Sequence, residues 1–503
     1  MAAGGAAAIT VPAFIRAEAP STGPTPADWA ALAHDLSGPL VRPGEASYAV
    51  SRRLFDPRFD GVSPAGIAYC QIARDVVACL AFVRKFKLPV VARCGGHSYA
   101  GYSTTTGLII DVSRIAGVAV SGNTATVAAG TRLIDFYHAL AAHGRAVPAG
   151  SCPTVGISGL TLGGGVGVVG RAFGLTCDRL QQVQIVTANG AILTASASEH
   201  PDLFWACRGG GGGNFGVVTR YTFSTVAAPS PWLFLLSWPW SQAAKVIAAW
   251  QSWAPHAPAQ MWSNLHLAAA PGGHTPTVRV GGCYIGSLNG VANLLNQLYA
   301  KVGSNPSSHF LNQFSYLNAM LLEAGCSSLG YTACHLPWQF PGGRLMRQPQ
   351  FAKSDFFTAP LSTAGINTLL HQIQLLQGVA GATGGVGGIA FDALGPTSVT
   401  NHVTPAATAF VHRNALFLAQ YTTDWTSGAA AAGVNNQHAW LRSFWTAMRP
   451  YASGQAYQNY IDPDLTNWQG AYYGSNYPRL QQVKKAYDPT RVFNFKQAIV
   501  PAK

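Results

Sequence analysis

Three glycine-rich segments constrain the fold of this chain more than any other feature of its sequence. They span residues 93–99, 150–167 and 208–218, and short apolar stretches typical of strands lie between them. Glycine lets the backbone approach a ligand closely and direct its N–H groups at that ligand. We therefore expect the main chain of all three segments to hold one large anionic ligand, such as a dinucleotide.

One stretch of the second segment, Gly165–Gly170, matches the G-x-G-x-x-G fingerprint of a Rossmann fold. That fingerprint follows a strand, opens a helix and is followed about 20 residues later by an acidic residue. Here Gly163 and Gly164 precede the match, and no acidic residue lies near Gly190. No Gly-Lys-Ser/Thr of a P-loop follows either, so the sequence argues against both nucleotide-binding folds.

The length of 503 residues exceeds what one hydrophobic core usually spans, so we expect more than one domain. The pattern changes at the proline-rich residues 227–231, which we interpret as a boundary. The predicted parts are an N-terminal segment 1–45, a first domain 46–228, a second domain 229–455 and a C-terminal segment 456–503. Local patterns predict strands at 89–93 and 108–110, hairpin turns at 122–123 and 189–190, and helices at 131–143 and 362–376.

The net charge of +13 suggests a nucleic-acid ligand, but the basic residues are scattered and form no run of five or more. We therefore expect a solvated basic surface and no nucleic-acid partner. Outside the apolar N-terminus, no stretch reaches the roughly 20 apolar residues of a membrane span. Ala17-Glu18-Ala19 resembles a signal-peptidase site, which favours a secreted or periplasmic protein and leaves a cytoplasmic one open.

The nine cysteines show no spacing suited to a metal, so we predict no metal site. Cys326 and Cys334 are candidates for a disulfide that the sequence leaves open. Two other residues lie where they could react with the expected ligand. His97 follows two glycines at the end of a predicted strand, and Cys152 lies in a second glycine-rich loop, so each could present a nucleophilic atom to it.

Several motifs occur together in a recognisable order. They are R-x-G-G-H-S-Y at 93–99, G-x-C-P-x-V-G-x-x-G at 150–159, L-G-G-G-x-G at 162–167, R-G-G-G-G-x-N-F-G-V-V at 208–218, and Y-Y-G-x-N, Y-D-P and F-x-x-x-Q between 472 and 497. This order resembles the berberine-bridge-enzyme-like branch of the vanillyl-alcohol-oxidase flavoproteins, over residues 47–226 and 456–500. The resemblance implies an α+β fold, in which a PCMH-type FAD-binding domain is completed by the C-terminal segment. It also implies a substrate domain with an antiparallel sheet backed by helices.

The resemblance further implies that FAD is bound covalently at two points, through His97 to the flavin 8α carbon and through Cys152 to flavin C6. The other residues expected to contact FAD are Arg93, Cys94, Gly95, Gly96, Ser98, Tyr99, Gly150, Ser151, Thr154, Val155, Gly156, Ser158, Gly159, Gly163, Gly164, Gly165, Gly167, Gly216, Val217, Val218, Tyr473, Asn476, Asn494 and Gln497.

Three residues resemble catalytic positions of that branch. Tyr460 matches the tyrosine that its carbohydrate oxidases use as a base, and Asp392 resembles the paired aspartate, although Gly395-Pro396 follows where relatives often have Gly-Gly. A free phenol has a pKa near ~10, so we expect Asp392 to accept the phenol proton through a short hydrogen bond. Alternatively, Tyr460 is a packing residue and Asp392 a turn residue. Val155 matches a position that governs O2 access, where valine is typical of oxidases.

We therefore expect an FAD-dependent oxidase of an alcohol or hemiacetal on a sugar, oligosaccharide or glycosylated natural product. Hydride would pass to flavin N5, and O2 would be reduced to H2O2. One alternative is a dehydrogenase or oxidative cyclase of a secondary metabolite, and another is a flavin-bearing surface protein without turnover. The expected partners are a small-molecule substrate and O2, and the sequence leaves the oligomeric state open.

Overall fold

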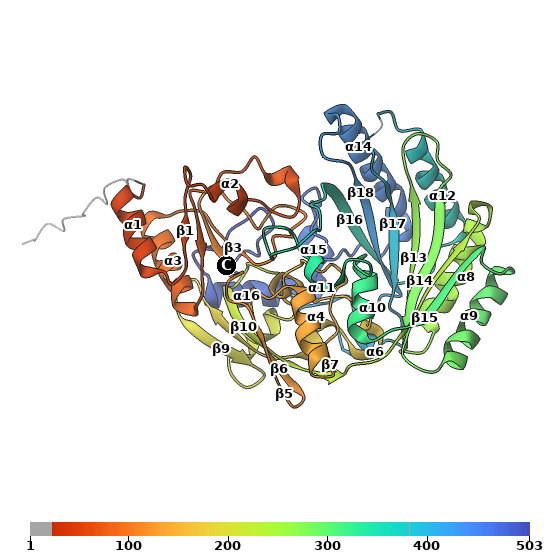
Figure 1. Cartoon of the computed structure of the whole chain (residues 1–503), viewed down its shortest axis with the longest axis horizontal. Coiled ribbons are helices and arrows are strands. Elements are labelled where there is room, and N and C mark those ends of the chain that lie inside the picture. The colour runs from red at the N-terminus through yellow and green to blue at the C-terminus, as the bar shows by residue number, and fades with distance from the viewer. Residues whose placement is uncertain (1–22, 382) are drawn as a thin grey trace, which may run out of the picture.

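The computed structural model describes residues 23–381 and 383–503, which form two domains side by side (Figure 1). The first domain begins with a four-stranded sheet in the order β1-β2-β4-β3, in which β2, β4 and β3 run parallel and β1 is antiparallel. Its elements are α1 (Pro26–Asp35), β1 (Leu40–Val41), α2 (Tyr48–Ser51), β2 (Gly66–Tyr69), α3 (Ala73–Phe86), β3 (Val90–Arg93) and β4 (Leu108–Asp111). The predicted strands at 89–93 and 108–110 are confirmed.

A five-stranded antiparallel sheet, ordered β5-β6-β10-β8-β9, completes the core of the first domain. Gly122 and Gly190 form its hairpin turns with φ of 55° and 89°, which glycine adopts without strain. Both predicted hairpins are therefore confirmed. The elements are β5 (Val118–Ser121), β6 (Thr124–Ala128), α4 (Leu133–Ala142), β7 (Arg145–Ala146), α5 (Ile157–Leu162), α6 (Gly170–Phe173), β8 (Leu180–Val186), β9 (Ile192–Ser196), α7 (Pro201–Ala206), β10 (Val217–Ser224) and β11 (Val226–Ala227).

The second domain contains a seven-stranded antiparallel sheet in the order β15-β12-β14-β13-β17-β18-β16. Helices α8, α9, α12 and α14 cover its outer face (Figure 1). The elements are β12 (Trp232–Trp238), α8 (Ala243–Trp253), β13 (Met261–Ala269), β14 (Thr277–Tyr284), α9 (Leu288–Val302), β15 (Ser308–Gln313), α10 (Tyr316–Glu323), α11 (Gly330–Ala333), β16 (Gln350–Phe357), α12 (Thr363–Gln377), β17 (Gly387–Ala393), α13 (Val399–His402), β18 (Phe417–Asp424) and α14 (Ala431–Met448).

The predicted helix at 362–376 is α12, and its sequence explains its bounds. The Ser362 side chain accepts a hydrogen bond from the Gly365 backbone N–H and caps the first turn. Four apolar side chains spaced three or four residues apart are buried against the sheet, as expected of an amphipathic helix: Ile366, Leu369, Ile373 and Leu376.

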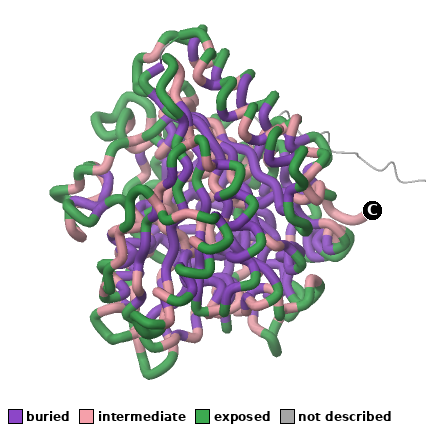
Figure 2. The backbone as a smooth tube through the Cα atoms, turned by 90° about the vertical axis from the view of Figure 1, so that its right-hand side faces the viewer, coloured by how far each residue is buried: buried purple, intermediate pink, exposed green. Residues whose placement is uncertain are grey.

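Alternation along the strands gives the seven-stranded sheet two different faces. On β13, Leu265, Leu267 and Ala269 pack under the helices, whereas Asn264 and His266 point to the opposite face. Figure 2 shows the buried strands at the centre of the molecule, with exposed turns and outer helix faces around them. The inner face of this sheet is thus not covered by these four helices and turns towards the first domain.

The C-terminal segment returns to the first domain, as the resemblance implied. Helices α15 (Trp468–Tyr473) and α16 (Tyr477–Tyr487) pack in the same core as the two sheets of that domain. Buried Lys484 pairs with Asp488 at 2.6 Å and donates a hydrogen bond to the Asn214 carbonyl of the third glycine-rich segment. The predicted α+β class and the antiparallel sheet backed by helices are confirmed.

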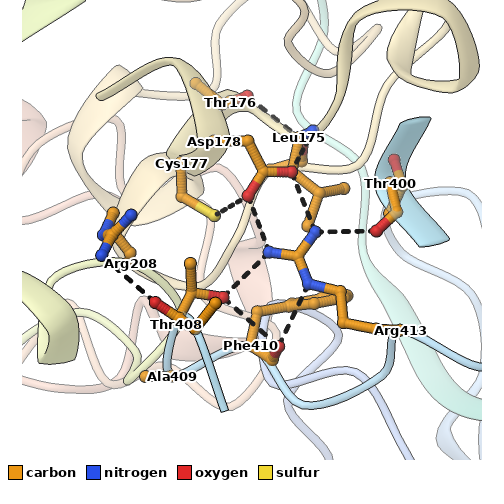
Figure 3. A network of polar contacts seen from close by, with 12 residues as sticks. Leu175, Thr176, Cys177, Asp178, Arg208, Thr400, Thr408, Ala409, Phe410 and Arg413 are labelled. Carbon is orange, nitrogen blue, oxygen red and sulfur yellow. Dashed lines mark hydrogen bonds and ion pairs between the residues drawn. The ribbon is translucent and has the colours of Figure 1, made fainter. Parts of the chain in front are cut away.

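A buried ion pair joins the two domains (Figure 3). Arg413, which follows α13, donates to both oxygens of Asp178 at 2.8 and 2.7 Å and to Thr408 Oγ1 at 2.9 Å. Arg413 is fully buried and Asp178 is 11% exposed. Such a bidentate pair fixes the orientation of both side chains as well as attracting them.

The described part of the N-terminal segment belongs to the first domain, whereas the prediction gave residues 1–45 as a separate segment. Residues 26–41 form α1 and β1, which belong to the first domain, so the described part of segment 1–45 is not separate from it. Residues 1–22, with the Ala17-Glu18-Ala19 motif, lie outside the described residues.

The disulfide that the sequence left open is present: Cys326 and Cys334 form it beside α10 and α11. Among the described residues, no helix is long and apolar enough to span a membrane.

Candidate cofactor and substrate site

A cavity of about 960 Å³ lies between the two domains. The three glycine-rich segments and the C-terminal segment line one part of it, and the inner face of the seven-stranded sheet lines the other. We call these the cofactor half and the substrate half. The volume is at the upper end of the range for ligand sites, which is consistent with a large ligand and a smaller one together.

Two glycines bring the first two glycine-rich loops together. A Cβ atom on Gly156 would lie 2.0 Å from Cys94 Sγ, and one on Gly95 would lie 2.3 Å from the Gly156 backbone nitrogen. No other residue type could occupy either position without displacing the opposite loop. This close contact places His97 and Cys152 in the lining of one cavity.

His97 is oriented so that one ring nitrogen remains available. Its ring stacks on Phe55 with a centroid distance of 4.1 Å, and its Nε2 atom is hydrogen-bonded to Thr154 Oγ1 at 2.9 Å. Within the described part of the chain, Nδ1 has no hydrogen-bond partner. Burial and the charge of Arg132 lower the pKa of His97 to about 3. The imidazole is therefore neutral at neutral pH, as a nucleophile must be.

Cys152 offers its thiol to the same cavity. It is the exposed one of the seven free cysteines that the structure describes, and its exposed surface faces the cavity. Burial within the surrounding protein raises the pKa of the thiol. The residue thus combines access from the cavity with shielding from bulk water, unlike the buried structural cysteines such as Cys177 and Cys207.

The cofactor half fits a dinucleotide in two respects. Four residues that line the cavity carry buried polar atoms with no hydrogen-bond partner among the described residues, which is costly unless a ligand satisfies them: Arg93 Nη1, Tyr102 Oη, Gln458 Oε1 and Gln497 Oε1. Bare glycine backbone also faces the space, since a Cβ on Gly159, Gly212 or Gly213 would meet no atom closer than 3.7 Å.

Most of the residues predicted from the sequence share this cavity. Besides His97 and Cys152, the lining includes Arg93, Cys94, Gly95, Gly96, Ser98, Tyr99, Gly150, Ser151, Val155, Gly156, Ser158, Gly159, Gly167, Gly216, Val217, Val218, Asp392, Tyr460, Tyr473 and Gln497.

Six predicted contact residues lie behind or away from the lining. Thr154 is buried and holds His97 from behind. A Cβ on Gly163, Gly164 or Gly165 would meet Asn459, Phe410 or Thr176, so these glycines serve packing between protein segments. Asn476 donates to the carbonyls of Pro405 and Thr408, and Asn494 is exposed beside Arg491.

Tyr460 and Asp392 face the same substrate half. The Tyr460 ring stacks on Tyr99 at 5.9 Å, and Asp392 projects from the inner face of β17. Burial raises the pKa of Asp392 to about 7, and burial with the charge of Asp392 raises the pKa of Tyr460 well above its usual value. Among the hydrogen bonds of the described residues, the expected bond between Tyr460 and Asp392 is absent. A substrate hydroxyl or water would have to bridge them.

The structure adds lining residues that the sequence analysis missed. Glu323, at the end of α10, faces the cavity, and burial together with the charge of Asp392 raises its pKa to about 7. Gln420 on β18 donates a hydrogen bond to Tyr99 Oη at 2.8 Å. Arg279 on β14 also lines the substrate half. All three lie outside the recognised motifs, and no local signal distinguishes them from ordinary surface residues.

Comparisons with known proteins agree with this architecture. The FAD binding domain family matches residues 64–196, and the berberine and berberine-like family matches residues 456–500. An uncharacterised FAD-linked oxidoreductase of Bacillus subtilis is 33% identical over 93% of this chain and 97% of its own length. The structure of a berberine-bridge-enzyme-like protein of Physcomitrella patens superimposes with a TM-score of 0.84 at 30% identity, covering 94% of this chain and 99% of that one. A xylooligosaccharide oxidase of Myceliophthora thermophila in complex with xylobiose gives 0.81 at 26%, with the same coverage.

Proposed function

The chain belongs to the berberine-bridge-enzyme-like FAD-linked oxidoreductases, and from that premise we propose that it oxidises an alcohol or hemiacetal group of a sugar or glycoside, with O2 as the acceptor. The observation that carries the proposal is that two nucleophilic side chains and a tyrosine–aspartate pair line one cavity. The likeness to an enzyme named as a xylooligosaccharide oxidase supports the class of substrate.

We propose that His97 and Cys152 each form a covalent bond to the FAD. His97 supports this because Thr154 occupies Nε2, Phe55 fixes the ring plane and Nδ1 remains available. Cys152 supports it because its free thiol is exposed to the cavity. The bound FAD supplies the chemistry of a two-electron acceptor, taking hydride from the substrate carbon and passing the electrons to O2.

Tyr460 and Asp392 would take the proton of the substrate hydroxyl. The raised pKa of Tyr460 makes phenolate scarce at neutral pH, so the tyrosine alone is a weak base. Asp392, with a pKa of about 7, is partly ionised near neutrality and can hold that proton. The O–H proton would therefore pass to Tyr460 Oη and on to Asp392, through a bridging water, as the C–H bond breaks.

We also propose that O2 reaches the site past Val155. Val155 lines the cavity three residues after Cys152, in the same loop.

We further propose that the protein is exported. The Cys326–Cys334 disulfide supports an oxidising compartment, where such bonds persist. N-terminal sequencing of protein recovered from outside the cytoplasm should begin near Pro20, and recovery from the cytoplasm alone with residues 1–19 intact would contradict export.

The test of the activity is a panel of sugars and glycosides mixed anaerobically with the holoprotein. A substrate should bleach the flavin absorbance, and air should then restore it with one peroxide formed per substrate consumed. Bleaching without peroxide would favour the dehydrogenase alternative. If no alcohol bleaches the flavin although dithionite does, the oxidase proposal fails.

Two tyrosine variants assign the proton-transfer role. Tyr460→Phe should slow flavin reduction by the roughly 10²–10⁴-fold typical of general bases, while the bound FAD remains. Tyr99→Phe is the matched control, since Tyr99 stacks on Tyr460 and its hydroxyl already accepts a hydrogen bond from Gln420. A larger loss in Tyr99→Phe than in Tyr460→Phe would transfer the role to Tyr99.

A further inference from the structure

Two basic side chains face the substrate half of the cavity without a counter-charge. Arg279 on β14 and His266 on β13 are direct cross-strand partners and both line the cavity. Among the described residues, neither side chain takes part in an ion pair or a hydrogen bond. The same surface places two donor groups side by side, facing a space that a ligand can enter.

The strand register fixes where this pair lies relative to the proposed catalytic residues. Asn264 pairs with Asp392, and His266, two residues further along β13, pairs with Ala390. Ala390 in turn pairs with Gln420. Arg279, His266, Ala390 and Gln420 thus form one row across the sheet, about 7 Å along the strands from the row of Asp392. The small side chain of Ala390 leaves the middle of the row open.

The charges in the substrate half are separated into two ends. Asp392 and Glu323 lie at one end, and their mutual repulsion is part of the reason that the pKa of Glu323 is raised. Arg279 lies at the other end, and burial with its charge lowers the pKa of His266, so the imidazole is neutral at neutral pH. A ligand with one anionic end would be repelled from the carboxyl end and attracted to Arg279.

We propose that the substrate carries an anionic substituent, a carboxylate or a sulfate ester, that Arg279 binds with His266 while a neutral hydroxyl end faces Tyr460 and Asp392. This inference rests on the proposed function and specifies its substrate class as acidic sugars. A guanidinium matches such an anion because its planar fork donates two parallel hydrogen bonds. The spacing of the two rows places the acidic group several bonds from the oxidised carbon, as on the second ring of a disaccharide.

Binding of three disaccharides to the holoprotein tests the inference without turnover. They are glucuronosyl-glucose, its methyl ester, which has nearly the same size and no charge, and glucosyl-glucose. Titrations followed by the flavin absorption of the Tyr460→Phe variant should show the acid binding about tenfold or more tightly than the ester, because charge-assisted hydrogen bonds are lost in the ester. A sulfated glucosyl-glucose in the same series distinguishes sulfate from carboxylate.

Variants at Arg279 assign the preference to this site. Arg279→Gln should bring the acid and the ester to equal affinity, and Arg279→Lys should keep part of the preference. Arg220→Gln, which changes an exposed side chain on β10, should keep all of it. Three results would overturn the inference. They are equal affinities for the acid and the ester when Tyr460→Phe is the only change, no binding of any anionic sugar, or a preference for the acid that survives in Arg279→Gln. If the acid binds but no sugar bleaches the wild-type flavin, the proposed function fails and the anion site stands. If neutral and acidic sugars bleach the flavin equally fast and bind with equal affinity, the anion site fails and the proposed function stands.

Discussion

The raised pKa values of Asp392 and Glu323 predict that flavin reduction at this site depends on pH near neutrality. Both have a pKa raised to about 7, so both are largely protonated at pH 6 and largely ionised at pH 8. Only ionised Asp392 can accept a proton, so the rate of flavin reduction should rise with pH through about 7 and then level off. Since two interacting carboxyl groups titrate as a pair, the inflection belongs to both.

Stopped-flow reduction between pH 5.5 and 9 measures this profile. Asp392→Asn should lower the plateau by about 10²-fold or more and remove the inflection. Glu323→Gln should keep the plateau and move the inflection to lower pH, because a repelling charge is removed. An unchanged profile in Asp392→Asn would show that another group takes the proton.

Val155 allows a second prediction at a single residue. It is half-buried in the cavity lining, and its carbonyl accepts a hydrogen bond from the Leu133 N–H, so its backbone is fixed. Val155→Leu adds one methylene where the packing cannot relax freely. Overpacking costs about 1–3 kcal/mol. A barrier of that size to O2 would slow reoxidation roughly 10- to 100-fold.

Mixing the anaerobically reduced protein with aerated buffer measures reoxidation directly. Val155→Leu should reoxidise about tenfold or more slowly than wild type, and its reduction by substrate should remain nearly the same. Equal reoxidation rates in the two proteins would show that Val155 does not control O2 access. Slow reoxidation in both would support the dehydrogenase alternative.

The contact between the first two glycine-rich loops can be tested as a structural element. Gly156 precedes α5, and a Cβ there would lie 2.0 Å from Cys94 Sγ and 2.6 Å from the Gly95 nitrogen. Gly156→Ala should therefore push the loops apart, lower the free energy of unfolding by at least about 1–3 kcal/mol and reduce the yield of attached flavin.

The matched control is Gly61→Ala, because a Cβ on Gly61 would meet no atom within 4 Å. Urea unfolding and the ratio of flavin to protein absorbance after denaturation provide the two readings. If Gly156→Ala matches Gly61→Ala in both, close loop packing does not position His97 and Cys152.

Local signals were sufficient to predict several elements. The hairpins at Gly122 and Gly190 and the helices at 131–143 and 362–376 follow from turn residues and apolar spacing, which act over a few positions. Motif order likewise predicted that His97 and Cys152 share a site. Neither kind of signal predicted α1 and β1 as part of the first domain, because their partners lie far along the chain.

The substrate half was much less predictable than the cofactor half. Arg279 meets His266 only because β13 and β14 pair in one register, and Glu323 and Asp392 come together only because the end of α10 and the inner face of β17 line the same cavity. The motifs also predicted cofactor contacts for residues that do not line the cavity. Asn494 and Gln497 belong to one motif, yet only Gln497 lines the cavity, since Asn494 points to the surface.

The buried pair of Arg413 and Asp178 links the two domains (Figure 3). Arg413→Ala would leave Asp178 without its partner in a largely buried position, which costs about 3–5 kcal/mol. We expect a correspondingly lower urea midpoint. Because the cavity lies between the domains, we also expect weaker retention of substrate.

Arg479→Ala is the control for the loss of an ion pair as such. Arg479 pairs with Asp202 at the surface, where the two side chains are 46% and 65% exposed, and exposed pairs contribute at most about 1 kcal/mol. A loss in Arg413→Ala no greater than that in Arg479→Ala would show that this buried pair does not stabilise the contact between the domains.

We propose that FAD is bound covalently through both His97 and Cys152, and the intact mass of the denatured holoprotein checks this. We expect the polypeptide mass plus one FAD in wild type and in each of His97→Ala and Cys152→Ala, because one bond remains in each single variant. The double variant should show the bare polypeptide and free FAD. If the wild-type protein releases its FAD on acid denaturation and shows the bare polypeptide mass, covalent attachment is excluded.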